Sequence, residues 1–369
     1  IRVIHAFIWF SVKKGGGTCD LMYKIVKSQE KHSALKPGII SSSDYLDNSL
    51  VKDLGKTKFI ITRKLFNLFN LNLNNPSFKK IYLFKPDIIH MHLFRSLQNI
   101  FLYFYCYFTN TPYVIDAHGS VPYWDKDNNK KKLFDFIIGK RIMLNASAWI
   151  AESDVGIKEY TDYFPELLEK KIDLISPPFG IEEFINLPKT SREEINEIYE
   201  VPKNNKIISF LGRLHKDKGI EFLLRGISSL LKKRSDITCL LVGSDDGHEI
   251  NLKKLAKELK IENNVYFVGF KSGSKKNEIL KNSDIVVQLS RFEQGAWAPI
   301  EGVLCGTPII VTRDTGAGED VARLDAGYLV EYENIDEFVS NVEYVLSNEV
   351  EAKIKTNLAR GYIINNLSM

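Results

Sequence analysis

The chain has 369 residues, of which 44% are hydrophobic, and its 50 basic and 46 acidic side chains leave a formal net charge of +4. A length of this order predicts two domains with sizeable cores, and so even a charge balance argues against a nucleic-acid-binding protein. Four scattered cysteines without a Cys-x-x-Cys pair are expected to be reduced, buried thiols rather than a disulfide or zinc framework: Cys19, Cys106, Cys239 and Cys305.

The first half of the chain alternates apolar runs of strand length with longer amphipathic stretches. A glycine run at 15–17 follows the first apolar run, and a helix is expected from 18 to 31. Between about residues 40 and 80 the sequence is rich in Ser, Asn and Lys and shows no clear period, so no element is predicted there. The alternation implies parallel strands with right-handed crossovers. Strands are expected at 2–8, 87–92, 113–119 and 148–152.

The aromatic stretch Ile100–Phe108 comes nearest to a membrane-spanning segment. It is shorter than the roughly 18 residues that a span needs, so a core helix is expected, with contact at a membrane interface as the alternative. Residues 1–7 have no basic leader and no small-residue cleavage site, so no secretory signal is expected. The basic runs 130–132 and 232–234 are expected to be solvated faces. The sequence thus predicts a cytoplasmic location, extended by peripheral contact with the inner membrane surface.

A break rich in Pro and Gly at 175–180 separates two predicted domains, 1–178 and 179–369. Beyond it the alternation restarts, which predicts a second α/β domain with a doubly wound parallel sheet. Ligands of such sheets bind at the carboxyl ends of the strands, so the loops after these strands should line one crevice. Strands are expected at 207–211, 238–242, 265–268, 285–289 and 309–311, and helices at 219–233, 252–259 and 352–369.

Two glutamates, Glu293 and Glu301, stand eight positions apart between two of these strands. On one regular helix they would lie about 12 Å apart, beyond the roughly 5 to 9.5 Å that the paired acids of glycoside hydrolases use. Pro299, which is favoured in the first turn of a helix, indicates instead that Glu293 lies in a loop and Glu301 near the helix start. Both acids would then lie beside a helix N-terminus, where phosphorylated ligands bind, and would accept hydroxyl groups. Two surface glutamates on either side of a turn are the alternative.

Two motifs of the second half resemble a known family, the retaining glycosyltransferases of family four. The family's strand, Gly-Arg, short loop and Lys-Gly are matched by Phe210–Gly219. Its two glutamates with seven residues between them, followed by Gly-x-Pro, are matched within 293–308. The likeness runs from about residue 3 to 365. It implies the GT-B architecture, in which two Rossmann-like domains face a central cleft, the first on the acceptor side and the second binding the nucleotide-sugar donor.

The resemblance implies roles for the charged residues of these motifs. Arg213 and Lys218 would neutralise the diphosphate as the donor sugar leaves. Glu301 would bind the ribose hydroxyls of the nucleotide, and Glu293 those of the donor sugar. Backbone amides at the following helix N-terminus would add partial positive charge. The predicted catalytic residues are Arg213, Lys218, Glu293 and His118. The predicted donor-binding set adds Glu301, Gly16, Gly17, Gly212, Gly295, Ala296 and Trp297.

The chain departs from the family in the loop that carries Glu293. Where relatives usually have glycines at the second and fourth places of the motif, this chain has Gln294 and Ala296, with its glycine at position 295. The difference alters the expected backbone path and with it the donor sugar that fits. Glu319 matches another recurring family glutamate, and capping of a helix is the alternative role for it.

In the first half, the glycine run 15–17 resembles the loop with which the family approaches the diphosphate or the acceptor, a plain flexible turn being the alternative. His118, at the end of a predicted strand, matches a family histidine close to the reacting sugar. His90 and His92 are two residues apart on a strand and therefore share one face. That face lies toward either the cleft or the core.

By resemblance, the chain moves a hexose from a UDP- or GDP-linked donor to a glycan or lipid-linked acceptor with retention of the anomeric configuration. No metal-ligand constellation is recognised, so a reaction without metal or cofactor is expected. In the family the terminal helices cross back to the first domain, and the helix at 352–369 is expected to make such a crossing or a shorter one. Two other classes share the architecture: nucleotide-sugar epimerases and non-catalytic partner subunits. The latter would tolerate loss of the motif residues, all of which are present.

Overall fold

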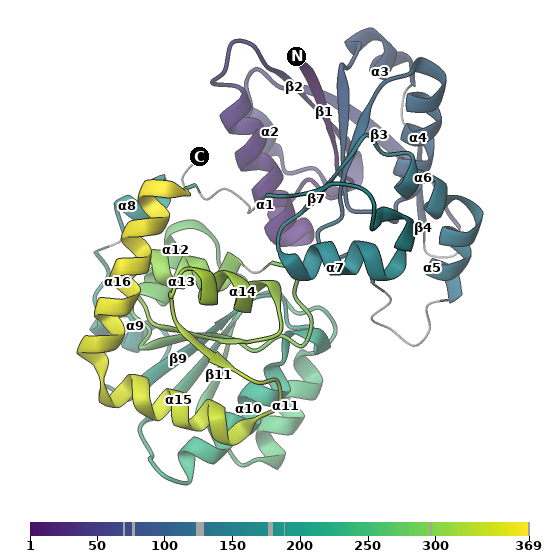
Figure 1. Ribbon diagram of the computed structural model, residues 1–369. Coiled ribbons are helices and arrows are strands. Elements are labelled where there is room, and N and C mark those ends of the chain that lie inside the picture. The colour runs from purple at the N-terminus through teal and green to yellow at the C-terminus, as the bar shows by residue number, and fades with distance from the viewer. Residues whose placement is uncertain are drawn as a thin grey trace. The chain divides into compact units, whose positions relative to one another are not determined.

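The computed structural model describes residues 1–68, 71–75, 78–122, 129–175, 180–187, 189–295 and 297–367. The chain divides into two compact units, Ile1–Pro178 and Phe179–Met369 (Figure 1). Residues 176–179 of the predicted break lie outside the described residues. Each unit is a layered α/β structure built on a largely parallel sheet, which confirms the predicted fold class.

The first unit contains an eight-stranded sheet with the order β4-β3-β2-β1-β5-β6-β7-β8. Seven strands are parallel, and only β4 runs antiparallel to its neighbour β3. The order reverses between β1 and β5, which are adjacent in the sheet although far apart in the chain. The strands are β1 Arg2–Ala6, β2 Lys36–Ser42, β3 Lys58–Leu68, β4 Leu71–Asn75, β5 Ile88–His92, β6 Tyr113–Asp116, β7 Ala148–Ala151 and β8 Ile172–Leu174.

Three helices of the first unit, α2, α4 and α7, begin at residues whose side chains cap them. For α4, the Ser96 hydroxyl accepts a hydrogen bond from the Gln98 amide, and Asn110 ends the helix in the left-handed conformation. The helix α1 begins at Val12, six residues before the predicted start, because it runs through the glycine run with a break at Gly16, where φ is +57°. The helices are α1 Val12–Gln29, α2 Asn48–Asp53, α3 Phe78–Phe84, α4 Leu97–Thr109, α5 Asn129–Phe134, α6 Lys140–Leu144 and α7 Asp154–Tyr163, with the π-helical η2 Asp135–Gly139 between α5 and α6.

The second unit contains a six-stranded, fully parallel sheet with the order β11-β10-β9-β12-β13-β14. Its strands are β9 Lys206–Leu211, β10 Ile237–Val242, β11 Val265–Gly269, β12 Ile285–Gln288, β13 Ile309–Thr312 and β14 Tyr328–Val330. Its helices are α8 Glu182–Ile185, α9 Arg192–Ile198, α10 Ile220–Leu231, α11 Glu249–Glu258, α12 Gly273–Lys281, α13 Trp297–Leu304, α14 Gly316–Arg323, α15 Ile335–Ser347 and α16 Glu349–Asn366, with a short 3-10 turn, η4 Lys216–Lys218, before α10.

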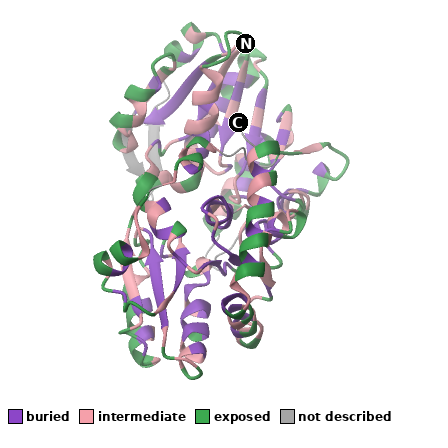
Figure 2. Ribbon diagram, turned by 90° about the vertical axis from the view of Figure 1, so that its left-hand side faces the viewer, coloured by how far each residue is buried: buried purple, intermediate pink, exposed green. Residues whose placement is uncertain are grey.

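Both sheets are buried between helical layers, and Figure 2 shows that the buried stretches follow the strands. Every residue of β10 is buried, as expected of a parallel strand that is covered on both faces. All four cysteines are free and buried, as predicted. Among the described residues, no helix is both long and apolar enough to cross a bilayer.

The last helix, α16, packs within the second unit. Ile363 and Ala359 join a cluster of buried side chains that includes Phe184. Arg360 ties the helix down further, because its guanidinium donates hydrogen bonds to the Leu304 and Phe184 carbonyl oxygens at 2.8 and 3.1 Å. The crossing to the first domain stays a prediction.

Two glycines allow the strand-end loops of the second sheet to approach one another. A Cβ on Gly219 would lie 1.7 Å from the Leu289 carbonyl oxygen, and one on Gly243 would lie 1.7 Å from that of Gly212. Gly219 also has φ of +64°, a conformation that side chains other than glycine disfavour. The loops that follow β9 and β12 therefore touch through backbone atoms.

We expect Gly219→Ala to lower the free energy of unfolding by about 3 kcal/mol or more, because the methyl group meets fixed backbone as well as an unfavourable φ. Gly273→Ala is the matched control, since Gly273 has φ of +56° but open space around it. Its cost should be only about 1 to 2 kcal/mol. Denaturant unfolding of the two variants measures the difference, and equal losses would contradict the close contact.

Candidate functional site

Two of the predicted residues, Lys218 and Glu293, meet at the carboxyl edge of the second sheet. The Lys218 ammonium donates to Glu293 Oε2 at 2.5 Å, and the Ser290 hydroxyl donates to the same oxygen at 3.1 Å. The side chains of Lys218 and Glu293 are 19% and 15% exposed. The pair is therefore partly shielded from water and still open on one side.

The loop that carries Glu293 is fixed by its neighbours. The Gln288 amide donates to the Ser290 hydroxyl at 2.6 Å, and the Thr312 hydroxyl donates to the Ser290 carbonyl oxygen at 2.7 Å. The Gly316 amide, in the first turn of α14, donates to the Glu293 carbonyl oxygen at 2.7 Å. Glu293 is thus held through both its backbone and its side chain, in the loop position that Pro299 predicted.

Arg213 follows Gly212 at the end of β9 and pairs with Asp246 in the loop after β10. Its side chain is 51% exposed. Exposed ion pairs contribute about 0 to 1 kcal/mol, so this contact can be exchanged for another anion at little cost. The two predicted cations therefore pair with different carboxylates, Lys218 with Glu293 and Arg213 with Asp246.

Glu301 lies near the start of α13, as predicted, and accepts a hydrogen bond from the Lys276 ammonium of α12 at 2.5 Å. The two side chains are only 10% and 12% exposed. Lys276 was not predicted as a site residue because it lies on a separate helix and outside both motifs. A carboxylate this deeply buried depends on its cation, because an unpaired buried charge is costly.

The remaining predicted residues occupy the same loops or the start of α1. Trp297 opens α13 after Gly295, and Ala296 between them lies outside the described residues. Gly16 and Gly17 belong to the first turns of α1. Helix α14 is capped by the Thr315 hydroxyl, which accepts from the Gly318 amide, so Glu319 is not needed as its cap.

The first unit holds a row of three histidines with buried side chains along the carboxyl edge of its sheet: His5 on β1, His92 at the end of β5 and His118 in the turn after β6. His5 Nδ1 lies 3.0 Å from His92 Nε2, and His92 Nδ1 lies 2.9 Å from His118 Nε2. Gln29 and Glu152 lie at the two ends of this row of histidines. Gln29 Oε1 is 3.0 Å from His5 Nε2, and Glu152 Oε1 is 2.7 Å from His118 Nδ1. His118, the predicted catalytic histidine, is the member beside the carboxylates.

The hydrogen bonds indicate which ring nitrogens of these three histidines carry protons. The Gln29 oxygen must accept, so His5 donates through Nε2 and, when neutral, accepts through Nδ1. His92 then donates to His5 through Nε2 and accepts from His118 through Nδ1. Because the Glu152 carboxylate also accepts a hydrogen bond, His118 carries hydrogens on both nitrogens and is an imidazolium.

The pKa values agree with this assignment. Burial lowers the pKa of His5 to about 4 and that of His92 well below its usual value. Burial also acts to lower the pKa of His118, but the charges of Asp116 and Glu152 outweigh it and raise that pKa to about 9. Burial, opposed by the His118 charge and reinforced by that of Glu152, raises the pKa of Asp116 to about 7.

His90 and His92 share one face, as predicted, and their ring centroids are 4.0 Å apart. His92 is buried, which favours the core interpretation for this face. Among the described residues, two sets could supply metal ligands: His5, His90 and His92, and His92, Asp116 and His118. The ring nitrogens of His5, His92 and His118 are already engaged in hydrogen bonds, so a metal ion at either set would have to displace some of these bonds.

Comparison with known proteins shows what this chain is similar to. Residues 191–361 match the family described as glycosyl transferases group 1. The chain is 25% identical over 278 residues to a D-inositol 3-phosphate glycosyltransferase of Corynebacterium urealyticum, covering 71% of this chain and 64% of that protein. It is 30% identical over 199 residues to an uncharacterised glycosyltransferase of Methanocaldococcus jannaschii, covering 54% of this chain and 48% of that protein. The second unit therefore resembles the group 1 glycosyltransferases, and the chain spans about half to two thirds of the length of these curated relatives.

Solved structures extend the likeness to both units of the chain. A glycosyltransferase from Rickettsia africae is 25% identical, with a TM-score of 0.74 over 100% of this chain and 94% of that one. Anabaena HepE is 16% identical and shares the fold, with a TM-score of 0.78 over 100% of this chain and 96% of that one. The motif residues Arg213, Lys218, Glu293 and Glu301 all fall within the matched family segment.

The row of buried histidines in the first unit predicts that the fold is sensitive to acid. The folded pKa of His5 is about 4, below its usual 6.5, so the unfolded chain takes up a proton that the folded chain does not. His5 therefore contributes stability that is lost as pH falls from 6.5 toward 4, by about 3 kcal/mol in all. We expect His5→Gln to reduce the slope of the free energy of unfolding against pH between about pH 7 and 5. The reduction should correspond to at most one proton fewer taken up on unfolding.

The matched control is His32→Gln, because the His32 side chain is exposed. Urea unfolding at several pH values gives the slope for each variant. The slope is informative even if His5→Gln is less stable throughout. An unchanged slope in His5→Gln would show that His5 is not held neutral in the fold.

Proposed function

We propose that this protein transfers a hexose from a UDP- or GDP-linked donor to a glycan or lipid-linked acceptor, with retention of the anomeric configuration. The observation that carries the proposal is the Lys218–Glu293 pair, in which both charges lie at the carboxyl ends of adjacent strands. Parallel sheets bind their ligands at that edge. The solved structures of Anabaena HepE contain UDP with glucose, or UDP-glucose, which supports a nucleotide-sugar donor by analogy.

The cations supply the electrostatic part of this mechanism. Negative charge builds on the diphosphate as the bond to the sugar breaks, so fixed positive groups stabilise the transition state more than the bound donor. Lys218 is already anchored at the strand edge by Glu293. Arg213 is paired with the exposed Asp246 and can turn its two-pronged guanidinium toward phosphate oxygens. Neither step calls for a metal ion or a cofactor.

The two glutamates supply the hydroxyl acceptors. Glu293 Oε2 is occupied by Lys218 and Ser290, and the remaining lone pairs of the carboxylate suit the hydroxyl groups of the donor sugar. Glu301 is held by Lys276 and can accept the vicinal hydroxyls of a ribose in the same way. Both carboxylates are thus pre-positioned by a cation before the donor arrives.

His118 acts through its charge in this proposal. Both of its ring nitrogens already have partners, and its side chain is buried, so a new hydrogen bond to substrate would break an existing one. Its backbone has φ of +45° and is followed by Gly119 at +72°, a strained turn of the kind found at functional sites. The Glu152 carboxylate at 2.7 Å balances the charge of this imidazolium, so the effect of His118 on the diphosphate is the part of the proposal that rests on the resemblance alone.

We expect Glu301→Gln to weaken the binding of free nucleotide and donor alike, whereas Glu293→Gln slows transfer more than it weakens nucleotide binding. Ribose contacts persist throughout the reaction, but contacts to the donor sugar tighten in the transition state. Loss of one such charged hydrogen bond should cost about 1.5 to 3 kcal/mol. Calorimetric titration with UDP and GDP, together with turnover, separates the two effects.

Glu258→Gln serves as the control, because Glu258 is an exposed glutamate of α11. A second variant, Lys276→Met, tests the buried ion pair. It should lower the free energy of unfolding because it removes the cation that pairs with Glu301. Adding Glu301→Gln to this variant should restore part of that stability. Unchanged nucleotide affinity in Glu301→Gln would remove Glu301 from the ribose site.

A further prediction concerns the cations. Lys218→Ala and Arg213→Ala should each lower turnover at saturating donor. The activation free energy should rise by about 2 to 4 kcal/mol, which is more than the expected loss of donor-binding free energy. Arg213→Lys should restore function only in part, because a point charge cannot reproduce the two-pronged phosphate contact. The exposed Lys232→Ala is the control.

Turnover in the presence of EDTA completes this test. The wild-type protein should keep its activity, since side chains neutralise the diphosphate. Complete loss on chelation, restored by magnesium or manganese, would mean that a metal performs the role assigned to Arg213 and Lys218.

A further inference from the structure

The first unit exposes large apolar side chains on two neighbouring helices, α3 and α4. On α4, Phe104 and Phe108 lie one turn apart and are 43% and 78% exposed. Contiguous exposed apolar patches on a soluble domain commonly mark binding surfaces. We call this patch the aromatic face, and it consists of Phe78, Tyr82, Leu83, Phe104, Tyr107 and Phe108.

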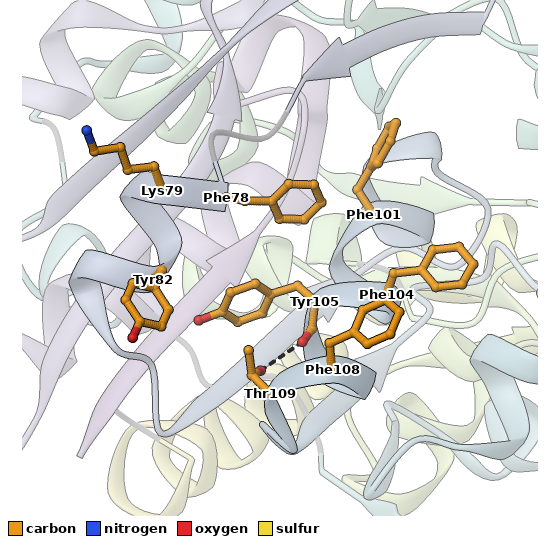
Figure 3. Close-up of a pocket in the computed structure, with 8 residues that line it drawn as sticks. All are labelled: Phe78, Lys79, Tyr82, Phe101, Phe104, Tyr105, Phe108 and Thr109. Carbon is orange, nitrogen blue, oxygen red and sulfur yellow. Dashed lines mark hydrogen bonds between the residues drawn. The ribbon is translucent and has the colours of Figure 1, made fainter.

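An open groove of about 580 Å³ runs through the aromatic face between α3 and α4 (Figure 3). Its floor is formed by stacked rings: the Phe78 ring lies parallel to that of Tyr105, at 6.3 Å between centroids, and edge-on to Phe101 at the same distance. The Thr109 hydroxyl at one end is occupied by a hydrogen bond to the Tyr105 carbonyl oxygen at 2.8 Å. The groove has the volume of a small-molecule site but offers mainly hydrocarbon.

The charged side chains of helices α3, α4 and α5 all have one sign. Helices α3, α4 and α5 contain no aspartate or glutamate, whereas α3 carries Lys79 and Lys80 and α5 carries the lysine run 130–132. Both α3 lysines are exposed beside the aromatic face. Such a surface would attract an anionic layer that is apolar beneath its charge.

The helix that continues from α5 repeats the pattern. Phe136 and Ile137 in η2 are 88% and 60% exposed, and they lie about one helical turn beyond the lysine run. Behind them, α6 packs with α4 in one core cluster through Ile142 and Met143. The aromatic face and this second exposed segment therefore belong to adjoining helices of the same unit.

We propose that the aromatic face binds the surface of a membrane that contains anionic phospholipid, and that the groove takes one acyl chain of such a lipid. The groove offers hydrocarbon and stacked aromatic rings for the chain, and the lysines lie where the phosphate of the headgroup would be. Aromatic residues beside lysines are typical of membrane interfaces. An acidic protein partner would use the lysines but would leave the groove without an occupant of matching chemistry. The inference does not rest on the donor site.

The first test is co-sedimentation of the full chain with phosphatidylcholine vesicles, with and without phosphatidylglycerol. The wild-type protein should bind the anionic vesicles and bind neutral ones far more weakly. Lys79→Glu/Lys80→Glu should weaken binding to anionic vesicles at least roughly 25-fold, since each lysine near an anionic surface is worth roughly fivefold. Phe104→Ser/Phe108→Ser should weaken it at least roughly tenfold.

Two exposed positions in the second unit provide matched controls: Lys254→Glu on α11 for charge and Ile250→Ser for apolar surface. Both should bind vesicles as the wild type does, and thermal unfolding of every variant shows that the fold is kept. Equal binding to neutral and anionic vesicles, or unchanged binding by the aromatic double variant, would overturn the proposal. So would failure to bind vesicles combined with self-association through the aromatic face.

A second measurement separates chain insertion from adsorption at the headgroups. Phe104→Trp places a fluorophore in the groove, and phosphatidylglycerol brominated on its acyl chains quenches only a tryptophan that reaches the hydrocarbon. Quenching beyond that of the wild type is expected for Phe104→Trp and none for the control Ile250→Trp. Quenching equal to the wild type in both would show that no acyl chain enters the groove.

Discussion

The candidate donor site depends on close backbone packing at the carboxyl edge of the second sheet. Gly219 lies against the Leu289 carbonyl oxygen, and Gly243 lies against that of Gly212, each without room for a Cβ. Lys218 precedes the first of these contacts, and Glu293 follows Leu289 by one short loop. The contact between backbones is therefore what allows a cation from one strand end to reach a carboxylate from another.

The ion pairs at this edge differ in burial, and that difference gives them different uses. Glu301 and Lys276 are almost fully buried and form a fixed pair, because separating buried charges is costly. Arg213 and Asp246 are about half exposed and exchange partners easily. Lys218 and Glu293 lie between these extremes. A charged ligand would thus find one fixed carboxylate, one shared pair and one exchangeable cation.

Much of the fold followed from the sequence because buried parallel strands are short apolar runs. The runs at 207–211, 238–242 and 285–289 each became a strand within one residue of the prediction. The stretch from 40 to 80 was not predictable in this way: β3 lies near the edge of the sheet and pairs with the antiparallel β4, so its residues lack the continuous apolar pattern of a central strand. The start of α1 was wrong because a glycine run indicates a loop, whereas only Gly16 leaves the helical conformation.

The site was predictable only where it is local in sequence. Glu293 and Glu301 were placed correctly in a loop and a helix because Pro299 marks the helix start. Lys276 and Asp246, which pair with Glu301 and Arg213, lie in other elements and follow no motif. The histidine chain requires the strand order β1-β5-β6-β7, and spacing along the chain carries no sign of that order.

Thermal unfolding of the full chain with a panel of UDP- and GDP-hexoses tests most directly whether this protein binds a nucleotide sugar, as proposed. At about 100 times its Kd, a true donor adds about 2.7 kcal/mol to the free energy of unfolding. At least one UDP- or GDP-hexose should raise Tm by an amount that corresponds to this gain in stability. Its nucleotide should be released when acceptor extract is added. If no nucleotide sugar of the panel raised Tm and no nucleotide were released, the account would be contradicted.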